Sequence, residues 1–182
     1  MDQFTPAEVE LMKNIAEVYQ YLKELLIYSE ELELDTFLPA INEIRDAFDH
    51  MMRVFAVRFE IKKEDNGYEM RNLNASFRHI YRATFELLDY IRICQKMWVD
   101  KTLNGISPQT LVAVFPEYYK EIKPEIDRAL EDLPRYREKK DIGDPKIDDI
   151  KNYVSYVRKI QSYFKRINQN LPALYAYEYT KR

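Results

Sequence analysis

The sequence predicts an all-α protein, a helical bundle of five to six helices, and three observations support this fold class. Apolar residues recur at intervals of three and four, the spacing that gives a helix one buried face. The 182 residues include only 3 glycines, so turns that need positive φ are scarce. Hydrophobic residues make up 46% and charged residues 32%, a balance typical of a globular domain. We therefore expect a single all-α domain over residues 1–182.

Helix start and stop signals divide the first half of the chain into three long helices. A capping-box pattern at residues 5–8 predicts a helix over about 6–32. The next helix is expected to start near Asp35 or Pro39 and to end before a polar turn. Its predicted buried stripe consists of Ile41, Ile44, Phe48, Met51 and Phe55. A third helix is predicted from about 69 to 103.

Prolines dominate the second half of the chain. Four of them should break the segment 107–140 into short helical pieces. A start signal at 144–145 leads into a clean helical stripe, so the core bundle is predicted to comprise 6–103 and 145–168. The tail after residue 170 has no clear period.

Charge and cysteine content limit the class of protein. The formal net charge is −3, but 8 acids and 2 bases in residues 1–34 give −6, and 7 bases and one acid in 151–182 give +6. A single cysteine, Cys94, cannot form an internal disulfide and is expected to be a packing residue. With no signal-peptide pattern and no apolar run near ~20 residues, we expect a cytoplasmic protein without a membrane partner. Metal and cofactor motifs are also missing from the sequence, so no cofactor is predicted.

The stretch EIRDAFDHMMR contains one of the two histidines and is the main candidate site. With the buried face of its helix centred on Ile44, the side chains of Arg45, Asp46, His50 and Arg53 lie on the opposite, polar arc. An ordinary solvated helix face would look the same. In that interpretation Arg53 forms an ion pair with an aspartate four residues earlier.

His79, the second histidine, lies on the polar face of the third predicted helix, together with Asn72. If this face meets that of His50, His79 would supply a second acid or base within one chain. The alternative is a surface histidine paired with Glu86.

The segment Arg45-Asp46-Ala47-Phe48-Asp49-His50 resembles the R-x4–6-H signature of the HEPN superfamily. This resemblance implies a compact helical bundle that acts as a metal-independent endoribonuclease in antiviral defence or a toxin–antitoxin system. It also implies a homodimer, in which a second Arg45 and His50 would enter the same cleft, and an antitoxin as a protein partner.

The chemistry of RNA cleavage needs residues of these types. His50 would act as general acid or base, because imidazole titrates near neutral pH. Arg45 would hold the phosphate through its guanidinium fork. Asp46, one helical turn before His50, would orient the imidazole. His79 and Arg53 are predicted as auxiliary residues.

The last helix interleaves basic and aromatic residues, which predicts an RNA-binding face at Arg158, Lys165 and Arg166. Its tyrosines can equally be buried in the bundle, and its basic side chains can equally dock an acidic partner. Two alternatives to the ribonuclease therefore stay open: a non-catalytic protein–protein interaction module, and an RNA binder without chemistry.

Overall fold

The computed structural model describes residues 3–132, 138 and 143–181. Over these residues the chain forms six α-helices and one short π-helix, with no β-strand. The predicted all-α fold class is therefore confirmed.

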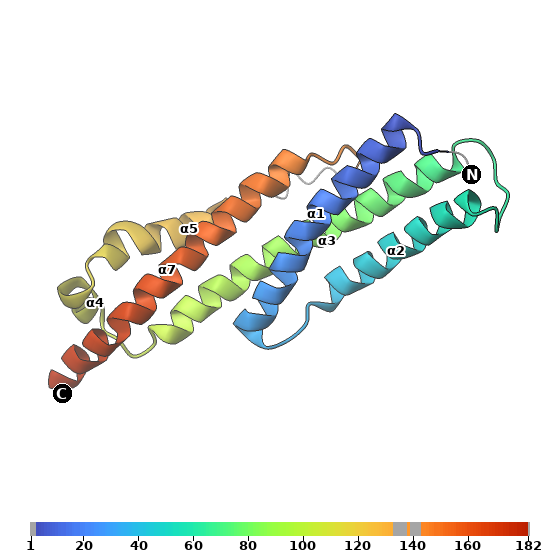
Figure 1. Cartoon of the computed structure of the whole chain (residues 1–182). Helices are drawn as coiled ribbons and strands as arrows, with labels where there is room; N and C mark the ends of the chain where they lie inside the picture. Colours follow the sequence, from blue (N-terminus) through green and yellow to red (C-terminus); the bar gives the residue numbers. More distant parts are fainter. Residues whose placement is uncertain (1–2, 133–137, 139–142, 182) are drawn as a thin grey trace.

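Three long helices form the first half of the bundle (Figure 1). They are α1 (Pro6–Glu33), α2 (Leu38–Arg58) and α3 (Tyr68–Thr102). α1 and α2 both pack against α3, and α2 runs antiparallel to α3. The predicted starts and ends of α1 and α3 agree with these bounds to within one residue.

One ion-pair cluster joins the ends of these three helices. The predicted capping box is present, since the Thr5 hydroxyl accepts from the Glu8 amide at 3.3 Å and the Glu8 carboxylate accepts from the Thr5 amide at 2.8 Å. Arg58, the last residue of α2, donates to Glu8 at 2.7 Å and forms an ion pair with Glu69 of α3 at 3.1 Å. Burial opposes ionisation of Glu8, but the Thr5 hydrogen bonds and the Arg58 charge outweigh it and hold the pKa of Glu8 below its usual value.

The second half of the chain contributes α4 (Pro108–Val114), η1 (Tyr118–Ile122, a π-helix), α5 (Lys123–Glu131) and α7 (Ile147–Thr180). As predicted, a short helix follows Ser107, whose hydroxyl caps α4 by accepting from the Thr110 amide at 3.3 Å. Pro124 lies in the first turn of α5, where a proline is tolerated. The break predicted at Pro134 lies outside the described residues.

The last helix, α7, is longer than the predicted core segment 145–168 and continues through Pro172. Contacts beyond the proline hold it in place. Glu178 accepts from the Ser107 amide at 3.1 Å, from the Ser107 hydroxyl at 2.9 Å and from the Thr110 hydroxyl. These hydrogen bonds, led by that of Thr110, lower the pKa of Glu178 to about 2. A tail without a hydrophobic period is thus helical because its end is bound to α4.

The core has two parts, and α3 and α7 contribute to both. One lies between α1, α2, α3 and the first half of α7, and the other lies between the ends of α3 and α7 and the elements α4, η1 and α5. In the second part Trp98 stacks on Phe164 with ring centroids 4.0 Å apart. Cys94 is buried, as predicted for a packing residue. Within the described residues, no helix has the length and apolar character needed to cross a membrane.

The charge asymmetry of the sequence is explained by the contact between α1 and α7. Glu17 and Glu24 of acidic α1 form ion pairs with Lys151 and Arg158 of basic α7. The two oppositely charged ends of the chain therefore partly neutralise each other.

Candidate active site

The helix that carries the main candidate residues is rotated relative to the prediction. Its buried residues are Ala40, Ala47 and Val54. The buried face is thus centred on Ala47, about 60° from Ile44. Phe48, predicted to be buried, is 61% exposed. The small alanine side chains let α2 approach α3 closely, and the rotation moves His50 from the polar arc to the edge of the helix contact.

The structure brings His50 and His79 together. Their rings stack with centroids 5.3 Å apart and planes inclined by 23°. In an α-helix every Cα–Cβ bond tilts toward the N-terminus, so side chains on the antiparallel helices α2 and α3 lean in opposite directions along the contact. His50 and His79 lean toward each other. The only two histidines of the chain therefore meet, although 28 residues separate them in the sequence.

Asn72 of α3 is the hydrogen-bond partner of His50. Its Oδ1 atom lies 2.8 Å from His50 Nδ1, and its Nδ2 atom donates to the Tyr68 carbonyl oxygen at 2.9 Å. Asp46, predicted to orient the imidazole, instead accepts from Nε and Nη2 of Arg45 at 3.1 and 2.9 Å. The orienting contact predicted for Asp46 is therefore made by Asn72.

Glu43 of α2 is the partner of His79. Its Oε2 atom lies 2.7 Å from His79 Nδ1, and its Oε1 atom accepts from Arg82 at 3.2 Å. The alternative prediction paired His79 with Glu86, whereas the structure pairs it with Glu43 across the helix contact.

An open pocket of about 490 Å³ lies beside the histidine pair, lined by Arg45, Asp46, Asp49, His50, Arg53 and His79. The structure thus gathers all five predicted catalytic and auxiliary residues. Arg45 and Arg53 form ion pairs with Asp46 and Asp49 at 2.9 and 2.6 Å. More than half of each arginine side chain is exposed, and exposed pairs of this kind contribute only about 0–1 kcal/mol. A phosphate can therefore compete for both guanidinium groups.

In each ring Nδ1 is engaged by a partner, and Nε2 is the remaining nitrogen. Among the described residues no hydrogen bond or ion pair engages Nε2 of His50 or of His79. Two imidazole nitrogens next to two arginines can exchange protons with a bound phosphodiester and stabilise its negative charge. No group of three His, Cys, Asp or Glu residues is placed to hold a metal ion in the part of the chain that the structure describes.

The predicted RNA-binding residues lie away from the histidine pair. They are on α7, and α1 and α3 lie between α7 and α2 (Figure 1). Arg158 is paired with Glu24, and Arg166 is paired with Glu121 at 2.9 Å. Lys165 is exposed and forms no ion pair with another described residue. Within one chain, therefore, the basic face of α7 does not extend the pocket.

Glu43 was not predicted from the sequence, and Asn72 was predicted to lie beside His79 but without a role. A signal for both was present in the spacing. Glu43 precedes His50 by seven residues on α2, and Asn72 precedes His79 by seven on α3. Seven residues are almost two full turns, so each pair shares one helix face with about 10 Å between its members. Only the antiparallel contact shows that each histidine uses the partner from the opposite helix.

No protein-family model matches this chain, and the comparisons with curated proteins and with solved structures also give no match. The HEPN resemblance of the segment from Arg45 to His50 therefore stays a prediction.

Proposed function

We propose that this protein is a metal-independent endoribonuclease in which His50 and His79 form the acid–base pair and Arg45 holds the phosphate. The stacking of the chain's only two histidines beside a pocket with two arginines is the observation that carries this proposal. The centroid separation of 5.3 Å supports the proposal, because two imidazoles this close together can both reach one phosphodiester.

The proposed reaction is an attack of the RNA 2′-hydroxyl on the adjacent phosphorus. One imidazole, neutral at Nε2, takes the hydroxyl proton as the bond from O2′ to phosphorus forms. The other imidazole, protonated at Nε2, gives its proton to O5′ as the bond from phosphorus to O5′ breaks. Arg45, with Arg53 as auxiliary, stabilises the negative charge that grows on the phosphoryl oxygens. The products are a 2′,3′-cyclic phosphate and a 5′-hydroxyl.

The biological part of the proposal comes from the HEPN resemblance. It comprises a role in antiviral defence or in a toxin–antitoxin system, a homodimer and an antitoxin partner. A cytoplasmic location is proposed from the sequence alone. The histidine pair supports the chemistry, and the resemblance supports the setting.

RNA cleavage by the purified protein in EDTA tests the proposal. We expect the wild type to produce 2′,3′-cyclic phosphate ends. Arg45→Ala is expected to lower kcat/KM by about 10- to 100-fold, because charge-assisted contacts contribute roughly 1.5–3 kcal/mol each. Lys101→Ala, which removes an exposed cation at the far end of α3, is the matched control and should cleave like the wild type.

The other outcomes of this assay are equally informative. Equal activity in the wild type and Arg45→Ala would remove Arg45 from the site. RNA binding without cleavage, with salt-sensitive affinity that depends on Lys165, would favour the RNA binder without chemistry. The absence of both binding and cleavage across several RNAs would contradict the ribonuclease.

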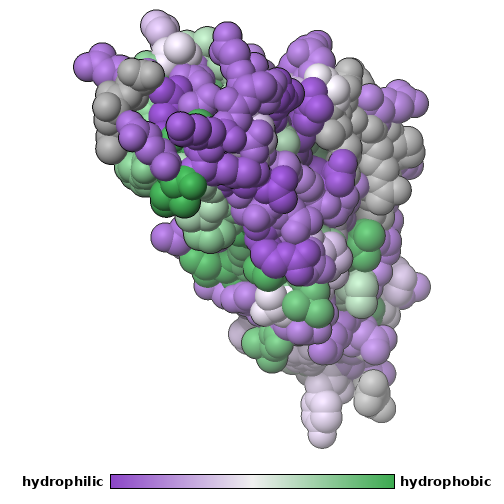
Figure 2. All heavy atoms as spheres, turned by 90° about the vertical axis from the view of Figure 1, so that its right-hand side faces the viewer, coloured by the Kyte–Doolittle hydropathy of each residue, from purple (hydrophilic) through white to green (hydrophobic). Residues whose placement is uncertain are grey.

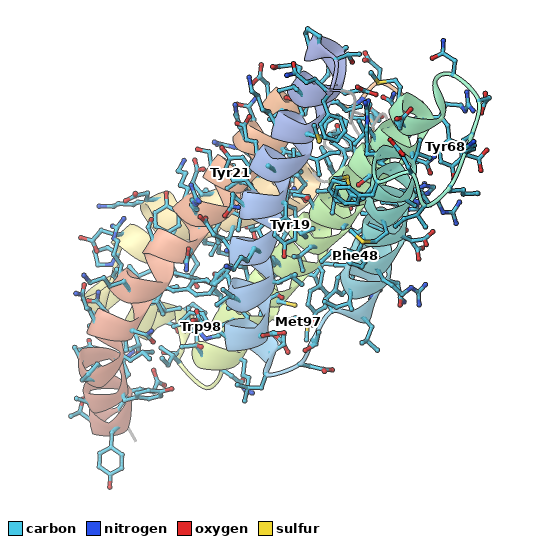
Figure 3. The ribbon with its side chains drawn as sticks, turned by 45° about the vertical axis from the view of Figure 1, so that its right-hand side comes forward. Tyr19, Tyr21, Phe48, Tyr68, Met97 and Trp98 are labelled. Atoms are coloured by element: carbon cyan, nitrogen blue, oxygen red, sulfur yellow. The ribbon has the colours of Figure 1, made fainter. Side chains whose placement is uncertain are left out.

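A second candidate function, a protein–protein interaction module, is favoured by the exposed apolar face of α2. Its large exposed side chains include Ile41, Phe48 and Met52. They fall within about 40° of one another around the helix. Figure 3 shows Phe48 on α2 and, on the neighbouring helix α1, Tyr19, which is also exposed. Hydrophobic side chains also form a band beside a broad hydrophilic area on the face shown in Figure 2. Apolar faces of this kind commonly mark interaction sites.

Sedimentation of Phe48→Lys tests this second function with a second copy of the chain as the partner. We expect the wild type to form a dimer and the variant to be a monomer, because the change places a charge in the middle of the apolar face. Tyr179→Lys adds the same charge at an exposed aromatic position at the end of α7 and should leave the dimer intact. A wild type that stays monomeric at high concentration would exclude α2 as a self-association surface.

A further inference from the structure

We infer that Asn72 and Glu43 are positioning residues that hold both imidazoles with hydrogen on Nδ1, which makes Nε2 the reacting nitrogen of His50 and of His79. This inference rests on the proposed ribonuclease function, and it assigns two further residues to the same site. Each positioning residue belongs to the helix opposite its histidine.

The Asn72 side chain can only accept a hydrogen bond from His50. Its Nδ2 atom donates to the Tyr68 carbonyl oxygen one turn earlier on α3, and this contact turns Oδ1 toward the ring. An amide oxygen has no hydrogen to give. His50 Nδ1 must therefore be the donor in the 2.8 Å contact. Asn72 is buried, so this orientation is protected from solvent.

The Glu43 carboxylate imposes the same tautomer on His79. Its two oxygens face different donors, with Oε1 bound to Arg82 and Oε2 at 2.7 Å from His79 Nδ1. An ionised carboxylate beside a guanidinium group only accepts hydrogen bonds. The side chain of Glu43 is 17% exposed, so water competes little for these contacts.

Both hydrogen bonds engage Nδ1, so in each ring Nε2 is the nitrogen that remains available. With Nδ1 occupied, Nε2 carries the lone pair in a neutral ring and the second hydrogen in a charged ring. All four residues come from one chain, so the acid–base pair needs no second copy. This differs from the HEPN resemblance, which implies a site that two chains complete.

Histidine ring ¹⁵N NMR tests the inference without an activity assay. Spectra recorded at about pH 9, where imidazoles are neutral, separate nitrogen that bears hydrogen from nitrogen with a lone pair. We expect both wild-type rings to carry hydrogen on Nδ1. Asn72→Ala should release this preference in His50 alone, and Glu43→Ala should release it in His79 alone.

Conservative variants separate positioning from a general loss of structure. Asn72→Asp and Glu43→Asp each present a carboxylate, which only accepts hydrogen bonds, and should restore the Nδ1 hydrogen. In the cleavage assay each alanine variant should lose at least about tenfold in kcat/KM and each conservative variant should regain most of it, because the wrong tautomer can cost about 10⁴-fold in kcat.

The outcomes distinguish this inference from the proposed function. A wild-type ring with hydrogen on Nε2 overturns the inference, even if RNA is cleaved. Rings that keep the Nδ1 hydrogen in both alanine variants overturn the assignment to Asn72 and Glu43. Wild-type protein with the expected tautomers but without cleavage overturns the ribonuclease and the reacting role of Nε2, while the positioning by the two residues stands.

Discussion

Alanine at either His50 or His79 is expected to lower kcat/KM for RNA cleavage by about 10²–10⁴-fold, the usual contribution of a general acid or base. The kcat/KM of the double variant should be within about tenfold of the kcat/KM of the less active single variant. Groups that act as one unit have strongly non-additive effects, since removal of one group already disables the step that the other would assist. Steady-state kinetics with a labelled oligonucleotide measures all three variants.

Two controls test whether the losses in the three histidine variants are specific to the histidine pair of one chain. Arg78→Ala changes an exposed position on α3 next to His79 in sequence and is expected to keep wild-type activity. Equal mixing of the His50→Ala and His79→Ala chains should restore no activity, because each site takes both histidines from one chain. Recovery on mixing would mean that two chains share the site. Losses that multiply in the double variant would mean that the two rings act independently.

The substitution Arg58→Met is expected to lower the free energy of unfolding by about 3 kcal/mol. Arg58 is 11% exposed and is paired with Glu8 and Glu69, which are 7% and 18% exposed. Removal of one partner from such a cluster leaves carboxylates partly buried without their counter-charge, which typically costs about 3–5 kcal/mol. For a chain of this length the melting temperature should fall by roughly 6–12 °C. Thermal unfolding followed by circular dichroism measures the change.

The effect of Arg58→Met should also depend on pH. Because the pKa of Glu8 is lowered from 4.5 in the folded protein, its contribution to stability is present above that value and is lost as the pH falls through the lowered pKa. The difference between wild type and variant should therefore shrink in acid. Arg53→Met removes an exposed arginine from the same helix and should cost less than about 1 kcal/mol. Equal losses in the two variants would contradict a special role for the Arg58 cluster.

Local signals were sufficient to predict the helices but not their rotation. The capping box at Thr5 is a pattern within four residues, so the start of α1 could be found in the sequence. The buried face of α2 was centred on Ile44 because the prediction gave bulky apolar residues the most weight. The structure buries the small residue Ala47 instead, since close approach to α3 depends on small side chains. The helical tail after Pro172 depends on Glu178 and its contact with α4, which no local period reveals.

The candidate site was predictable to a similar degree. His50 and His79 were recognised from residue type and from their polar surroundings, and the possible meeting of their faces followed from helix geometry. The partners of the two rings could not be assigned in this way, because each hydrogen bond joins different helices. Asp46 lies near His50 in the sequence, but its carboxylate accepts a hydrogen bond from the neighbouring Arg45 and not from His50. Asn72 is the partner of His50 because the alignment of α2 with α3 brings these two residues opposite each other.

The seven-residue spacing on each helix defines a search pattern. It reads E-x6-H on one helix and N-x6-H on its antiparallel neighbour, and this double pattern is far rarer by chance than R-x4-H alone. Unrelated chains that carry it can be recognised without overall similarity. The same four residues can also be transplanted onto a designed helical hairpin with an alanine contact, where they would hold two imidazoles face to face in the absence of the remaining bundle.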